Sequence, residues 1–153
     1  MKTKHIVIWQ SGEPIQTDTD GHNPMRAINL SEFLLKKKYR VSLISSNFDH
    51  TKKKLRFKKI KKFKKIKLSK NFNLILINSP GYKKNIGFSR LIDHFLLAYN
   101  LKFFLKKNKE KIDFAIIGFP PIETAIVFSN WLALNKIPHI SDIKDLWPEY
   151  FYE

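Results

Sequence analysis

Five short runs of apolar, largely β-branched residues are the feature that most constrains the fold of this chain. They lie at residues 5–9 (HIVIW), 41–46 (VSLISS), 72–78 (FNLILIN), 113–118 (DFAIIG) and 137–143 (IPHISDI). Runs of this length and composition suit strands that are buried on both faces.

Amphipathic segments separate these strands. Helical spacing starts at Pro24, with Asn23 as the expected N-cap, and ends in the lysines at 36–38; it recurs over 86–107 and 122–135. We expect the 86–107 helix to bury one broad face. This alternation predicts an α/β domain: an open parallel sheet with helices on both faces, joined by crossover connections. The 153 residues are sufficient for one domain.

Positive charge is concentrated in one segment of the chain. Residues 51–70 contain twelve Lys or Arg and no acid, so the formal net charge of +16 leaves only +4 for the remainder. The spacing of apolar residues here fits neither a regular helix nor a regular strand. We therefore expect an irregular excursion, or a hairpin whose second strand is 72–78. The lysines are either a solvated surface or an attraction for anions.

Overall composition narrows the function classes. The sequence is 43% apolar and 14% aromatic, which argues against disorder, and it has no Cys, which excludes disulfide scaffolds, zinc ribbons and thiol catalysis. Four of the 29 basic residues are Arg, so recognition of specific nucleic acid sequences is disfavoured. No signal-peptide core or bilayer-spanning run is evident, and no His pair has metal-ligand spacing. A cytoplasmic protein without metal is expected.

The carboxyl ends of the strands are where an open α/β sheet binds ligands. The loop after the first strand carries Gly12 and Gly21 ahead of a helix N-terminus, where backbone N–H groups can hold a phosphate. The GxGxxG spacing of dinucleotide-binding proteins is absent, and an ordinary long loop is the alternative. Arg26, in the first turn of that helix, is either a partner for an anionic ligand or a surface residue.

Two acid–imidazole pairs are further candidates. Asp49-His50 follows the second strand and Asp93-His94 lies in the 86–107 helix. Either pair could orient a hydroxyl or shift the pKa of its His toward neutral pH. Adjacent residues of a helix point in different directions, so unrelated surface groups are the alternative for Asp93-His94.

The segment 142–149 (DIKDLWPE) gathers three acids around Trp147 directly after a predicted buried strand. Carboxylates such as Asp145 and Glu149 could contact sugar hydroxyls there, and a Trp can stack on a pyranose ring. A capped turn with an anchoring Trp is the alternative.

Four sequence blocks in order resemble bacterial glycosyltransferase family 4. They begin with NPMRAINLSEFLLKKKYRVSL and continue with SSNFDHTKKK, PGYKKNIGFSRLIDH and DIKDLWPEYF, so the resemblance covers nearly the whole chain. The subgroup that it resembles carries FDH and DLWP motifs. The chain departs from the family where Tyr39-Arg40 stands in place of the usual Gly-His.

The resemblance implies a GT-B enzyme, in which two Rossmann-like domains face each other across a cleft. Residues 1–153 would form the N-terminal, acceptor-side domain, with 51–70 as an excursion within it, and the donor-binding domain would be absent. The chain would then be a fragment or one half of a split enzyme, and inactive alone. The donor would be a nucleotide sugar, and the acceptor would be a saccharide or a lipid-linked saccharide. The resemblance implies no cofactor or metal.

Site residues follow from the same resemblance. Asp145 would face the reacting sugar as the catalytic candidate. The implied substrate-binding residues are Gly21, Arg26, Asp49, His50, Arg90, Asp93, His94, Trp147 and Glu149.

The implied product is a surface polysaccharide such as capsule or O-antigen lipopolysaccharide. The enzyme would be peripheral on the inner face of the plasma membrane, held to anionic lipid by 51–70. The alternative is a non-catalytic basic module that binds anionic membrane or nucleic acid.

Overall fold

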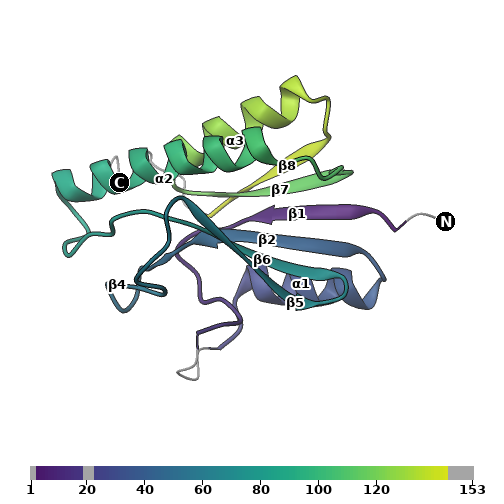
Figure 1. Cartoon of the computed structure of the whole chain (residues 1–153), viewed down its shortest axis with the longest axis horizontal. Helices are drawn as coiled ribbons and strands as arrows, with labels where there is room; N and C mark the ends of the chain where they lie inside the picture. The colour runs from purple at the N-terminus through teal and green to yellow at the C-terminus, as the bar shows by residue number, and fades with distance from the viewer. Residues whose placement is uncertain (1–2, 19–22, 145–153) are drawn as a thin grey trace, which may run out of the picture.

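A six-stranded sheet lies between helices in the computed structural model, which describes residues 3–18 and 23–144 (Figure 1). Helix α1 covers one face of the sheet, and α2 and α3 cover the other. The elements are β1 (His5–Trp9), α1 (Arg26–Lys36), β2 (Arg40–Ser46), β3 (Phe48–Asp49), β4 (Lys54–Leu55), β5 (Phe63–Ser69), β6 (Phe72–Ile77), α2 (Phe88–Lys107), β7 (Phe114–Phe119), α3 (Ile122–Leu134) and β8 (His139–Ile143).

The strand order is β5-β6-β2-β1-β7-β8. Pairing is parallel from β6 through β8, and β5 adds to β6 as an antiparallel edge strand. The short strands β3 and β4 form a separate antiparallel pair. This confirms the predicted Rossmann-like α/β fold with helices on both faces.

Alternation along each strand divides the core into two clusters. In β1, Val7 and Trp9 belong to the cluster under α2 and α3, whereas Ile6 and Ile8 belong to the cluster under α1. Successive side chains of a strand point to opposite faces, so strands buried on both sides read as continuous apolar runs.

Helix α1 begins two residues later than the sequence suggested. The N-cap is Met25, not Asn23, and its side chain makes no capping hydrogen bond. The carboxylate of Glu13 supplies the missing acceptor: the Ala27 N–H donates to Glu13 Oε2 over 2.9 Å. An acid from the preceding loop thus satisfies a free N–H of the first turn and favours the positive end of the helix dipole.

Helix α2 buries fewer of its apolar residues than the sequence predicted. Leu97, Leu101, Phe104 and Leu105 are buried beneath it. The apolar residues on its outer side remain exposed; these are Phe88, Leu91, Ile92, Phe95, Leu96 and Tyr99. The expectation that one broad face would bury the apolar residues of this helix is therefore wrong for its first three turns.

The Lys-rich segment 51–70 is ordered and supplies the edge of the sheet. Its second half is β5, which pairs with β6 as the predicted hairpin. In β5, Phe63 packs on Phe104 at 5.1 Å between ring centroids, whereas Lys64 and Lys65 are exposed. Lysines on an edge strand oppose pairing with the edge of another molecule, so part of this charge has a structural role.

Arg56, the one Arg of this segment, is a buried clamp. Its side chain is 5% exposed and forms an ion pair with Asp18, with Nη2 and Oδ2 separated by 2.8 Å. The same guanidinium donates to the carbonyls of Glu13, Ser46 and Phe48. It therefore connects the loop after β1 to the antiparallel pair β3–β4.

We expect Arg56→Met to lower the free energy of unfolding by about 3–5 kcal/mol, because it removes the guanidinium from a buried carboxylate. Arg40→Gln is the matched control: its ion pair with Glu110 is partly exposed and is worth about 1 kcal/mol or less. Urea denaturation followed by circular dichroism measures both. Equal losses in the two variants would contradict the clamp.

Candidate functional site

A cavity of about 300 Å³ opens at the carboxyl ends of the parallel strands. Residues that follow β1, β2, β6, β7 and β8 contribute to it, together with the first turns of α2. The cavity lies beside the point where the strand order reverses, between β1 and β7. Its lining residues are Gln10, Ser11, Gly12, Glu13, Met25, Ser46, Phe48, His50, Tyr82, Arg90, Asp93, His94, Leu97, Pro120, Pro121 and Lys144.

Tyr82 is the centre of one wall of this cavity. Its hydroxyl lies 2.5 Å from His50 Nδ1. The ring packs against Phe48, with 4.9 Å between centroids, and meets His94 edge-on at 6.2 Å. Burial raises the pKa of Tyr82, so the phenol stays protonated and can donate its O–H to His50. The wall is therefore a connected set of rings from three separate parts of the chain.

Gly81 and Asp93 set the position of Tyr82. Gly81 has a φ of +78°, and a Cβ built there would lie 2.5 Å from the Phe48 ring. Its N–H donates to Asp93 Oδ1 over 2.6 Å. Asp93 is buried on α2, so this bond fixes the turn after β6 against that helix.

Lys53 and Arg90 add positive charge to this wall. Lys53 Nζ lies 4.6 Å from the centroid of the Tyr82 ring, and the Arg90 guanidinium carbon lies 5.8 Å from it. Both cations hydrogen-bond to Asn85, Lys53 to the side chain and Arg90 to the carbonyl. Within residues 3–18 and 23–144, neither has a carboxylate within ion-pair distance.

This charge changes the titration of the neighbouring groups. Loss of water, followed by the charge of Arg90, lowers the pKa of Lys53. Burial lowers the pKa of His50, and Lys53 and Arg90 lower it further, although Asp49 opposes them. A lysine whose pKa is lowered by a neighbouring cation, in a cavity wall that also holds an arginine, is typical of a site that receives an anion.

His94 is a second imidazole whose pKa is lowered. Burial lowers its pKa even though Glu123 of α3 favours the protonated form, with His94 Nδ1 and Glu123 Oε2 separated by 3.5 Å. Arg90 Nε lies 3.4 Å from His94 Nε2. At neutral pH, the rings of His50 and His94 are therefore uncharged, and both lie beside Arg90.

Glu13 and Lys144 form an ion pair on the other side of the cavity. Glu13 also caps α1 through Ala27, so one carboxylate links the loop after β1, the start of α1 and the residue after β8. The ion pair and the helix cap of Glu13 together hold these three segments in place at the rim of the cavity.

The structure brings four of the predicted site residues together. His50, Arg90, Asp93 and His94 all line the cavity. The two predicted acid–imidazole pairs do not form within themselves, because His50 meets Tyr82 and His94 meets Glu123 and Arg90.

Asp49 and Arg26 have other partners. Asp49 is buried and accepts the N–H groups of Thr51 and Lys52 at 2.9 and 3.0 Å, so it caps the turn after β3 and does not line the cavity. Arg26 is exposed at the start of α1 and forms an ion pair with Asp142 of β8 at 2.5 Å. The hydrogen bond with Asp142 raises the pKa of Arg26.

The remaining candidates, Gly21, Asp145, Trp147 and Glu149, lie outside the described residues.

Glu13, Lys53 and Tyr82 are site residues that the sequence analysis did not single out. Tyr82 lies within the GYKKN block, next to a turn glycine, and Glu13 is an acid between a strand and a helix. Lys53 had no distinguishing signal, because lysines surround it in the sequence.

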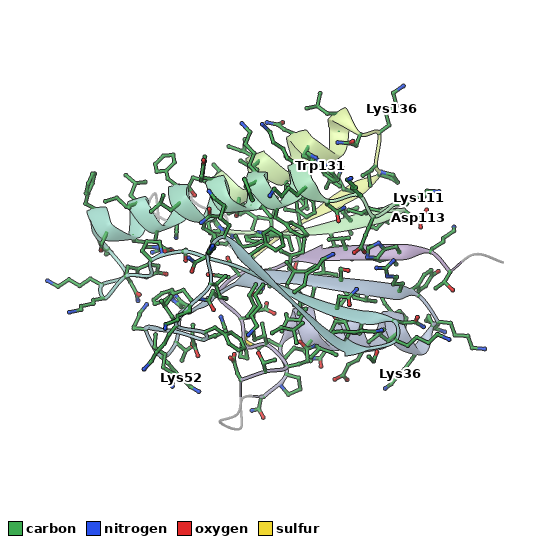
Figure 2. The ribbon with its side chains drawn as sticks, viewed as in Figure 1. Lys36, Lys52, Lys111, Asp113, Trp131 and Lys136 are labelled. Carbon is green, nitrogen blue, oxygen red and sulfur yellow. The ribbon has the colours of Figure 1, made fainter. Side chains whose placement is uncertain are left out.

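A second hollow, of about 470 Å³, lies at the opposite end of the sheet. Four residues that line it, Lys111, Asp113, Trp131 and Lys136, are labelled in Figure 2, and Asp113 is already paired with Lys111 at 3.2 Å. None of the predicted site residues that the structure describes lines this hollow. We therefore regard the cavity at the carboxyl ends as the candidate site.

Comparison with protein-family models finds no match, and no curated protein matches the chain. In the part of the chain that the structure describes, no set of three or more His, Asp or Glu side chains is placed to hold a metal ion. Among those residues, none of the helices has the length and apolar character to cross a membrane.

Gly81→Ala and Gly12→Ala test how the site is held. Both glycines have φ near +80°, but only at Gly81 would a Cβ strike another side chain, whereas at Gly12 it would meet nothing within 4 Å. We expect Gly12→Ala to lower the free energy of unfolding by about 1–2 kcal/mol. For Gly81→Ala, overpacking against Phe48 adds about 1–3 kcal/mol. Thermal and urea unfolding measure the difference, and equal losses would show that the Phe48 contact does not hold the turn.

Proposed function

We propose that this chain is the acceptor-binding domain of a retaining, nucleotide-sugar-dependent glycosyltransferase that builds cell-surface polysaccharide. One observation carries the proposal. The blocks NFDH (47–50), GYKKN (81–85) and RLIDH (90–94), which resemble glycosyltransferase family 4, lie far apart in the sequence yet line a single cavity through His50, Tyr82 and Arg90.

The chemistry of the cavity fits a saccharide that carries phosphate. When its Nδ1 accepts from Tyr82, the uncharged His50 carries its ring proton on Nε2, which can donate a hydrogen bond to a sugar hydroxyl. Lys53 and Arg90 supply positive charge for a phosphate, which Arg binds with directed donors. The rings of Phe48 and Tyr82 give apolar surface for the sugar.

The proposed reaction joins the acceptor to a donor sugar. The acceptor hydroxyl oxygen bonds to the anomeric carbon, the bond from that carbon to the donor diphosphate breaks, and the hydroxyl proton leaves with the diphosphate. This domain would bind and orient the acceptor, and a second domain would hold most of the nucleotide sugar. Asp145 stays a prediction as the residue that faces the reacting sugar.

The proposal includes a place in the cell. A lipid-linked acceptor would keep the domain at the cytoplasmic face of the plasma membrane, with the lysines of 51–70 attracted to anionic lipid. The other candidate is a basic module without catalysis, favoured by the exposed lysines of β5.

Binding to the 153-residue chain tests the acceptor role. The probe is a saccharide on a short, water-soluble isoprenyl diphosphate, titrated and followed by nuclear magnetic resonance. We expect Arg90→Gln and His50→Gln to weaken binding about tenfold to a hundredfold, because each removes a hydrogen bond to a charged or polar group of the ligand.

Lys36→Gln is the control for this experiment. Lys36 is exposed at the end of α1, remote from the Lys52 end of the molecule (Figure 2). Its substitution should leave the affinity unchanged. Equal weakening in all variants, or tighter binding to DNA than to the saccharide, would favour the basic module instead.

The affinity should also increase as the pH falls from 7.5 to 5.5. The pKa values of His50 and His94 are lowered in the free protein, so both imidazoles are uncharged at pH 7.5. A bound anion favours their protonated forms, so proton uptake and binding support each other as the pH falls below about 6.5. A diphosphate diester has no ionisation of its own in this range.

The double variant His50→Gln/His94→Gln should bind with a nearly flat pH profile. A wild-type affinity that decreases on acidification would contradict the role given to the two histidines.

A further inference from the structure

The first three turns of α2 present an apolar face that no described residue covers. Phe88, Phe95 and Tyr99 are 75%, 58% and 59% exposed, and Ile86, just before the helix, is 90% exposed. The exposed apolar positions follow the spacing i, i+3, i+4, i+7, i+8 and i+11, so they form one stripe. They are Phe88, Leu91, Ile92, Phe95, Leu96 and Tyr99.

Among the described residues, every exposed charge on α2 and on the segment just before it is positive. Between residues 80 and 109 the acid is Asp93, which is buried on the other side of α2. The exposed cations are Lys83, Lys84, Lys102, Lys106, Lys107 and Lys109. Lys62 of the Lys-rich segment also reaches the helix, with Nζ 4.4 Å from the centroid of Tyr99 and 4.7 Å from that of Phe103.

We propose that this face, Ile86 to Tyr99 with its flanking lysines, inserts into the headgroup region of an anionic lipid bilayer. Apolar and aromatic residues bordered by lysines are what an interfacial helix needs, because the rings enter the acyl boundary while the ammonium groups stay with the lipid phosphates. The inference rests on the membrane location in the proposed function and deepens it by naming the surface that enters the lipid, but it does not depend on sugar transfer.

Charge distinguishes this partner from a second copy of the chain. In a twofold contact the same face would meet itself, which would bring the lysines of one molecule against those of the other. Glu123, the acid of the adjacent helix α3, is half-buried and directed to His94. The apolar stripe of α2 and its lysines are complementary to a partner that combines negative charge with an apolar interior. A membrane with anionic lipid is such a partner.

The cavity lies close to this surface, on the other side of the same helix. Arg90, Asp93, His94 and Leu97 line the cavity from the opposite side of the same helical turns. A helix is about 10–12 Å across, so a membrane on the outer face would lie within about that distance of the cavity wall. A ligand anchored in the lipid could reach the site without leaving the bilayer.

Vesicle binding by the full chain tests the proposal. The probes are vesicles of phosphatidylcholine alone and of phosphatidylcholine with 30% phosphatidylglycerol, sedimented at low and high salt. We expect strong binding to the anionic vesicles only, weakened by salt. Phe88→Ser/Phe95→Ser should reduce partitioning at least tenfold, and Lys83→Gln/Lys84→Gln about tenfold to thirtyfold.

Matched controls lie on the other face of the sheet. Phe33→Ser removes an aromatic ring of α1 that is 55% exposed, and Lys36→Gln/Lys37→Gln removes two lysines nearby. Both should bind vesicles like the wild type. Thermal unfolding of each variant confirms that the chain is folded before binding is compared.

The depth of insertion gives a second measurement. Phe88→Trp should show blue-shifted fluorescence and quenching by brominated acyl chains, relative to the wild type, whereas Phe33→Trp should show neither. Arg90→Gln should still bind vesicles even if it loses the saccharide, so failure of the proposed function and failure of this inference are distinguishable.

Three results would overturn the inference. The first is unchanged vesicle binding by Phe88→Ser/Phe95→Ser. The second is binding that depends solely on the β5 lysines, tested by Lys64→Gln/Lys65→Gln/Lys67→Gln. The third is a wild-type dimer that Phe88→Ser/Phe95→Ser dissociates, which would make the face an interface between copies.

Discussion

Parallel pairing of β1 with both β2 and β7 is the constraint on which the rest of the structure depends. It aligns the strands so that their carboxyl ends meet at one edge, and the loops that follow them must share that edge. Residues as distant in sequence as Glu13 and Lys144 therefore become neighbours. The cavity exists because the loops leave the sheet together, and its chemistry depends on which side chains those loops carry.

Charge has three different roles in this molecule, although the sequence presents it as one excess. Arg56 is buried and holds the loop after β1 against the antiparallel pair β3–β4. The lysines of β5 protect an open sheet edge. Lys53 and Arg90 lie beside the Tyr82 ring, and no carboxylate among the described residues is within ion-pair distance of either. Burial and neighbours distinguish these roles, and a count of lysines does not.

Most of the fold could be predicted from the sequence because strand and helix periods are local properties. The five apolar runs became β1, β2, β6, β7 and β8, and the strand-end rule located the cavity. Features that depend on distant partners could not be predicted. Met25 is the N-cap while the distant Glu13 accepts from the first turn, and Asp49 caps its own loop where a ligand contact was expected. The exposed stripe of α2 has the same spacing as a core-facing stripe, so sequence alone could not tell the two apart.

The β5–β6 hairpin has a consequence for how the chain folds. Parallel strands can pair only after a crossover has been traversed, whereas a hairpin joined by a short turn closes in microseconds. Within the six-stranded sheet, β5 and β6 are the adjacent strands joined in this way. The most highly charged part of the chain is thus able to form its strand pairing earliest, and it presents β6 as a template on which β2 can dock. Lysines that suggest an external partner also keep this early hairpin from joining another chain before the parallel sheet is complete.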